Sequence, residues 1–91
     1  MSSAQSPIHH LKCWPEWFRF IRNGEKTAEL RLDDRHFQVG DTLVLRGWDP
    51  TTEVYTGHTE EVRYVTHVLR DHPGLTPGYV MLSLVKEPAW R

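Results

Sequence analysis

The sequence predicts one domain of the α+β class, mainly β, in which about five short strands form a small β-barrel with one packed helix. Three observations predict it. Five apolar segments are separated by short stretches of turn residues, as in strand-rich domains. Only the segment after Pro15 has the period of a helix. A chain of 91 residues is long enough for one hydrophobic core, which the strands must share, and too short for two.

The first strand is expected at Ile8–Lys12, where apolar and polar residues alternate. His9 and His10 are adjacent in this segment and therefore point to opposite faces of the sheet. Two side chains on opposite faces do not chelate one metal ion, so we interpret both as structural or surface residues.

The helix is expected to begin at Pro15, where the missing N–H does no harm, and to end at Asn23-Gly24. About two and a half turns are too short for an isolated helix, so it must pack on the sheet. Its expected apolar stripe consists of Trp17, Phe18 and Ile21.

The next strand is expected to follow Lys26, over residues 27–32, and it has two very different faces, because alternate side chains of an extended chain point to opposite sides. The apolar set predicts a core face and comprises Ala28, Leu30 and Leu32. The polar set comprises Thr27, Glu29 and Arg31, with Lys26 at the start of the strand. This polar strip carries most of the functional interest of the chain.

The remaining strands are expected at 42–48, 61–69 and 79–84. Asp41 lies in the turn before the first of them and is interpreted as a turn former rather than a catalytic acid. Residues 49–58 are expected to form a loop, because the segment starts with Asp-Pro and is polar. We expect residues 1–7 to be a flexible tail, 8–86 to be the domain and 87–91 to be a C-terminal tail.

Composition narrows the functional classes. The formal net charge is −1, so any polyanion must be bound by a local patch rather than by an overall positive field. Cys13 is the only cysteine, which excludes an internal disulfide and favours a reducing, cytoplasmic compartment. No apolar run has the length of a membrane span. Phosphate-loop, dinucleotide, zinc and serine-hydrolase motifs are all missing, so no cofactor and no metal are expected.

The order of short motifs resembles the ASCH group of the PUA-like superfamily, over Ile8 to Leu84. In particular it resembles an uncharacterised bacterial and phage family of that group for which RNA binding has been suggested. The segment Gly24 to Arg31, with the pattern Gly-x-Lys-x-x-Glu-x-Arg, is the most specific part. The other motifs are His10-Leu11-Lys12, Pro15-Glu16-Trp17-Phe18, Asp33-Asp34-Arg35, Val39-Gly40-Asp41, Tyr55-Thr56-Gly57 and Gly78-Tyr79-Val80.

The resemblance implies a PUA-like barrel with a helix beside a groove that Lys26, Glu29 and Arg31 would line. The chain departs from the pattern twice: Asp33 replaces an Asn, which adds a negative charge, and His58 replaces an Arg, which removes a cation. A related branch hydrolyses acylated cytidines with a Lys-Thr-x-Thr-x-Arg segment. Glu29 stands where that branch has its second Thr, which puts that chemistry in doubt here.

Three hypotheses from different classes follow. In an RNA-binding module, Lys26, Arg31 and Arg35 would meet phosphates of RNA or of a nucleotide-like ligand, and aromatic side chains would stack on bases. The candidate ligand-binding residues are Trp14, Lys26, Thr27, Glu29, Arg31, Asp34, Arg35 and Tyr55, with Trp48 as a further stacking residue.

In a small hydrolase acting on modified nucleosides or single-stranded RNA, Lys26 would be the catalytic base and Glu29 a proton shuttle. In a non-catalytic protein-interaction domain, Lys26, Glu29 and Arg31 would only form internal salt bridges. A groove lined by these three residues would favour the first two hypotheses, and their full burial in mutual pairs would favour the third.

Overall fold

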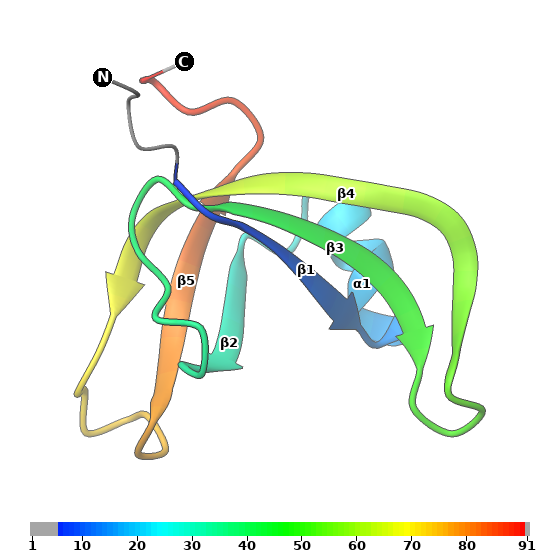
Figure 1. Ribbon diagram of the computed structural model, residues 1–91, viewed down its shortest axis with the longest axis horizontal. Coiled ribbons are helices and arrows are strands. Elements are labelled where there is room, and N and C mark those ends of the chain that lie inside the picture. Colours follow the sequence, from blue (N-terminus) through cyan, green and yellow to red (C-terminus); the bar gives the residue numbers. More distant parts are fainter. Residues whose placement is uncertain (1–5, 91) are drawn as a thin grey trace.

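The structure, a computed structural model, describes residues 6–90 (Figure 1). Strand β1 (Ile8–Cys13) and helix α1 (Pro15–Arg22) are followed by β2 (Ala28–Leu32), β3 (Thr42–Asp49), β4 (Val54–Leu69) and β5 (Tyr79–Val85). The expected mainly β architecture of five strands and one helix is confirmed. Residues 1–5 of the expected N-terminal tail, and Arg91, lie outside the described residues.

All five strands belong to one sheet with the order β1-β3-β4-β5-β2. β1 pairs with β3 in parallel, and the other neighbours are antiparallel. The sheet curls into a half-barrel (Figure 1) whose two edge strands are β1 and β2. We call the unpaired boundary between these edge strands the seam.

Two arginines bridge the seam. Arg31 Nη2 donates a hydrogen bond to the carbonyl of Lys12 (2.9 Å), and Arg35 Nη1 donates one to the carbonyl of His10 (3.1 Å). Guanidinium groups from the β2 side therefore satisfy backbone carbonyls of β1. In a closed barrel, backbone hydrogen bonds between the two edge strands would satisfy these carbonyls instead.

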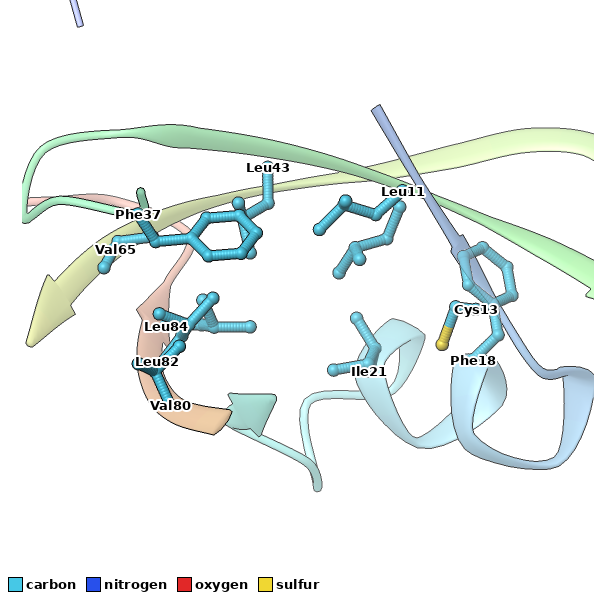
Figure 2. Packing of buried hydrophobic residues seen from close by; sticks show 11 residues of the cluster. Leu11, Cys13, Phe18, Ile21, Phe37, Leu43, Val65, Val80, Leu82 and Leu84 are labelled. Atoms are coloured by element: carbon cyan, nitrogen blue, oxygen red, sulfur yellow. The ribbon is translucent and has the colours of Figure 1, made fainter. Parts of the chain in front are cut away.

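The hydrophobic core lies on the inner face of the curled sheet, where α1 packs. Figure 2 shows Phe18 and Ile21 of α1 reaching towards Leu11 and Cys13 of β1. The other buried apolar side chains are Phe37, Leu43, Leu45, Val65, Val80, Leu82 and Leu84.

The apolar stripe of α1 is narrower than expected. Phe18 and Ile21 are buried, but Trp17 is 46% exposed, so its expected place in the stripe is wrong. Buried Arg63 of β4 fixes the end of the helix, because its Nη2 donates to the carbonyl of Ile21 (2.7 Å). None of the described residues forms a helix with the length and apolar character needed to cross a membrane.

The faces of β2 are the reverse of the expectation. Glu29 is buried, whereas Leu30 and Leu32 are 61% and 49% exposed. The pairing with β5 explains this, because Glu29 lies opposite Leu82 and cross-strand partners share a face. The polar set of this strand therefore points inward beside the seam, and its charges are paired there.

Strand β4 begins earlier than expected. The segment 55–58 belongs to the strand rather than to a loop, and Val54 and Tyr55 at its start pair with Asp49 and Trp48 of β3. The register shifts between Arg46 and Trp48 of β3, so β4 bulges there. The resulting β-hairpin arm has exposed residues from 51 to 60, which explains why polarity alone suggested a loop.

At the C-terminal end, Pro88 is buried and Trp90 is exposed.

A buried polar pair supports the turn before β3. The His9 ring donates from Nε2 to Asp41 Oδ2 (2.8 Å), and both residues are buried. The amide of Gln38 donates to the same carboxylate oxygen (3.0 Å). Asp41 thus holds the turn to β1, as its interpretation as a turn former implies. His10, the neighbour of His9 in β1, points to the opposite, exposed face.

Asp33 holds the loop after β2 to the end of β4. Its Oδ1 accepts the amide of Phe37 (2.9 Å), and its Oδ2 pairs with Arg70, which also donates to the Phe37 carbonyl. Desolvation alone would raise the pKa of Asp33. The Phe37 amide and the Arg70 charge outweigh it, so the pKa lies below its ordinary 3.8.

Asp33 is therefore expected to contribute to acid sensitivity. A lowered pKa gives stability that is fully present above the ordinary pKa and is lost as the pH falls through the lowered one. We expect the free energy of unfolding of Asp33→Asn to fall less than that of the wild type between about pH 5 and pH 2. Urea titrations measure this slope. Asp34→Asn, at the exposed neighbouring position, is the control, and equal slopes for Asp33→Asn and the wild type would contradict the prediction.

Candidate ligand-binding groove

A cavity of about 790 Å³ opens beside the seam, between the start of α1 and strands β2 and β5. We call it the groove. Its charged lining residues are Lys12, Glu25, Lys26, Glu29 and Arg31. Its apolar lining includes Trp14, Trp17, Leu30, Leu32, Tyr79 and Met81. The groove thus combines flat apolar surface with three cations and two carboxylates.

Lys26, Glu29 and Arg31 form one ion-paired cluster in the groove wall. Lys26 Nζ lies 2.5 Å from Glu29 Oε1, and Arg31 Nε donates to Glu29 Oε2 (3.0 Å). Lys26 also donates to the carbonyl of Ala28. The Glu29 side chain is only 6% exposed, but those of Lys26 and Arg31 are 30% and 22% exposed. The carboxylate is therefore covered, while both cations reach solvent.

The backbone explains why these three side chains meet. Gly24 has φ +85°, the left-handed conformation that ends a helix and that glycine adopts most readily. The amide of Lys26 then returns to the carbonyl of Phe20 (2.9 Å), which positions Lys26 at the start of β2. Glu29 and Arg31 share a face of that strand.

An aromatic pair forms the helix side of the groove. The rings of Trp14 and Trp17 are stacked, with centroids 4.9 Å apart and planes inclined by 7°. Trp14 precedes Pro15 and Trp17 lies in the first turn of α1, so the helix start fixes their spacing. Trp14 is 43% exposed and Trp17 46%. A flat aromatic surface beside cations suits a planar ligand that carries negative charge.

Cys13 lines the groove from the core side, and its thiol is not poised for nucleophilic attack. The pKa of the Cys13 thiol is raised from its ordinary 9.0 to about 11, mainly by burial and also by the Glu29 charge. Arg31 and Lys26 act in the opposite direction without restoring the ordinary value. The thiol is therefore protonated at neutral pH.

The structure brings together five of the residues that the sequence nominated: Trp14, Lys26, Thr27, Glu29 and Arg31 line the groove. It places three others outside the groove lining. Asp34 is exposed in the turn after β2, Arg35 binds the carbonyl of His10, and Tyr55 lies in the β3–β4 arm against Arg46.

Trp17 and Lys12 also line the groove, although neither was expected there from the sequence. The three-residue separation of Trp14 and Trp17 across a helix start was a usable signal, because such residues become neighbours in a helix. Among residues 6–90, no group of three or more His, Cys, Asp or Glu side chains has an arrangement that could hold a metal ion.

Comparison with known proteins identifies the family. The family model described as "Domain of unknown function (DUF3850)" matches residues 8–84. The chain belongs to this family. The matched DUF3850 region contains every residue that lines the groove.

A curated relative comes from a bacteriophage. The chain is 39% identical over 78 residues to the "Uncharacterized 12.9 kDa protein in GpA 3'region" of Escherichia phage P2. This match covers 86% of the chain and 68% of the relative. The DUF3850 fold is therefore shared with a phage protein over most of both chains.

Proposed function

We propose that this DUF3850 domain binds single-stranded RNA through the groove. The observation that carries the proposal is the exposed Trp14–Trp17 stack beside the solvent-accessible cations Lys26 and Arg31. Bases stack on aromatic side chains without strong sequence preference, and unpaired bases are the ones available for stacking. Phosphates next to a stacked base would meet the two cations.

The charge balance of the groove sets the expected strength of binding. Glu29 already neutralises part of the charge of Lys26 and Arg31. If these two cations meet two phosphates, the logarithm of the binding constant should fall by about 1.4 per tenfold rise in salt. The proposal therefore requires modest affinity, with stacking as the larger contribution.

Lys26→Ala and Trp17→Ala test the proposal. We expect Lys26→Ala to weaken binding of a fluorescein-labelled hexauridylate, and to lower its salt slope by about 0.7, because one phosphate contact is lost. We expect Trp17→Ala to weaken binding at every salt concentration by about fivefold or more, because a stacking surface is lost. Fluorescence anisotropy at low and moderate salt measures both.

Lys86→Ala is the matched control, since it removes an exposed lysine outside the groove lining. Melting curves check that each variant is folded. If the wild type does not bind, or if both groove variants bind like the wild type, RNA binding by the groove is excluded, and a protein-interaction role becomes the better hypothesis.

A second candidate function rests on a separate observation. Lys26 Nζ lies 2.5 Å from the buried carboxylate of Glu29. The base of the hydrolase hypothesis, Lys26, is therefore in contact with its proton shuttle, Glu29. Thr27 also lines the groove. A hydrolase acting on RNA or on an acylated nucleoside would use such a pair. RNA recovered after the titration and sized on a gel distinguishes the two functions: intact RNA supports binding, and shortened RNA that requires Lys26 and Glu29 supports hydrolysis.

A further inference from the structure

A second set of aromatic and cationic side chains lies on the outer face of the sheet, and all of its members except Lys12 are outside the groove lining. Lys12 Nζ lies 4.3 Å from the centroid of the Trp48 ring, and the Arg46 guanidinium carbon lies 4.0 Å from that of the Tyr55 ring. We call these four residues the outer row. They come from β1, β3 and β4, which are neighbours in the sheet.

The pairing of the strands makes the outer row continuous. Lys12 lies opposite Arg46 in the β1–β3 pair, and Trp48 lies opposite Tyr55 in the β3–β4 pair. The row points away from the core, because its members on β1 and β3 alternate with buried residues. Lys12 also lines the groove, so the outer row begins where the groove ends.

The outer row is not needed for the hydrophobic core. Tyr55 is 45% exposed and lies in the β3–β4 arm, which projects from the half-barrel (Figure 1). Arg46 is held by a second contact, since its Nε donates to the carbonyl of Gly57 (3.0 Å). A surface cation–π pair contributes only about 0.5–1 kcal/mol, so fold stability alone gives little reason for two of them side by side.

We propose that the outer row is a second contact surface for the same single-stranded RNA, so that the ligand extends over several nucleotides. This inference rests on the function proposed above. One part of the strand occupies the groove, and its continuation crosses β1 at Lys12 and follows the outer row towards Tyr55. Bases stack on the guanidinium of Arg46 and on the aromatic rings, while Lys12 moves from Trp48 to a phosphate.

The dimensions and charges of the outer row fit a short stretch of RNA. Three neighbouring strands span about 10 Å, room for two or three nucleotides at about 3.4 Å or more each. Glu60 lies opposite Arg46 and offsets one of the two positive charges. The outer row should therefore act mainly by stacking, and its contribution should depend only weakly on salt.

Binding of oligouridylates of two lengths tests this inference. We expect a decamer to bind the wild type about tenfold more tightly than a tetramer, because only the decamer reaches both surfaces. Tyr55→Ala and Arg46→Gln should bring the decamer close to the affinity of the tetramer and leave tetramer binding unchanged. Trp17→Ala in the groove should weaken both lengths. A decamer with a terminal photoreactive uridine should crosslink to the outer row, which peptide mapping identifies.

The outcomes separate the two proposals. If both lengths bind equally well, and neither Tyr55→Ala nor Arg46→Gln changes decamer binding, the outer row is excluded while the groove remains the RNA site. If neither length binds the wild type, both proposals are overturned. Tyr55 is exposed, so its replacement should leave the melting temperature nearly unchanged, and a folded variant makes either result decisive.

Discussion

The Asp41→Ala variant is expected to lose about 2–3 kcal/mol in its free energy of unfolding. The Asp41 carboxylate is 1% exposed and receives hydrogen bonds from the His9 ring and the Gln38 amide, both at Oδ2. Its Oδ1 has no hydrogen-bond partner among the described residues, so the two contacts at Oδ2 are the hydrogen bonds that act against the cost of burying the group. Alanine would leave the buried His9 ring without its acceptor.

Urea titration at neutral pH measures this loss. Asp41→Asn keeps an oxygen at the same position and should lose less, which also covers the case in which Asp41→Ala does not fold. Asp34→Ala is the matched control, because Asp34 is exposed and its replacement should change stability by no more than about 0.5 kcal/mol. A loss below about 1 kcal/mol for Asp41→Ala would mean that the pair does not hold the turn.

The Glu29→Gln variant is expected to separate binding from catalysis. The change keeps the size of the side chain but removes the charge between Lys26 and Arg31. If the groove binds RNA, affinity at low salt should rise by about three- to tenfold, because a carboxylate no longer repels phosphates. If Glu29 carries a proton in a hydrolytic reaction, turnover should instead be lost.

The same variant has a readout that needs no ligand. The charge of Glu29 contributes to the raised pKa of the Cys13 thiol, so Glu29→Gln should bring that pKa below about 11. The pH dependence of thiol alkylation measures the shift. Glu25→Gln is the control, since Glu25 also lines the groove and is not among the groups that shift Cys13. An unchanged Cys13 profile would contradict the described proximity of the two charges.

Much of the fold follows from the sequence. Alternating apolar residues located all five strands, and Pro15 and Gly24 marked the helix and its end. Alternation shows which residues share a face but not which face points inward. In β2 the more apolar face was the natural expectation for the core, but this edge strand borders the seam, where paired charges point inward.

The groove was predicted in part. The Gly24 to Arg31 segment nominated the charged cluster, because its spacing on a strand places Glu29 and Arg31 on one face. Trp17 was missed because a helix of eight residues has room for only two core positions, Phe18 and Ile21, and its sequence does not show where the stripe ends. The position of Tyr55 was missed because an exposed hairpin is as polar as a loop.

The seam bears on how the domain avoids self-association. An edge strand with free backbone carbonyls is a template for a strand from another molecule, and such pairing is a route to aggregation. The carbonyls of His10 and Lys12 are already bound by Arg35 and Arg31. The half-barrel can therefore stay open at the side of its groove, because an incoming strand would meet the bulky, charged guanidinium groups of Arg31 and Arg35 instead of these two carbonyls.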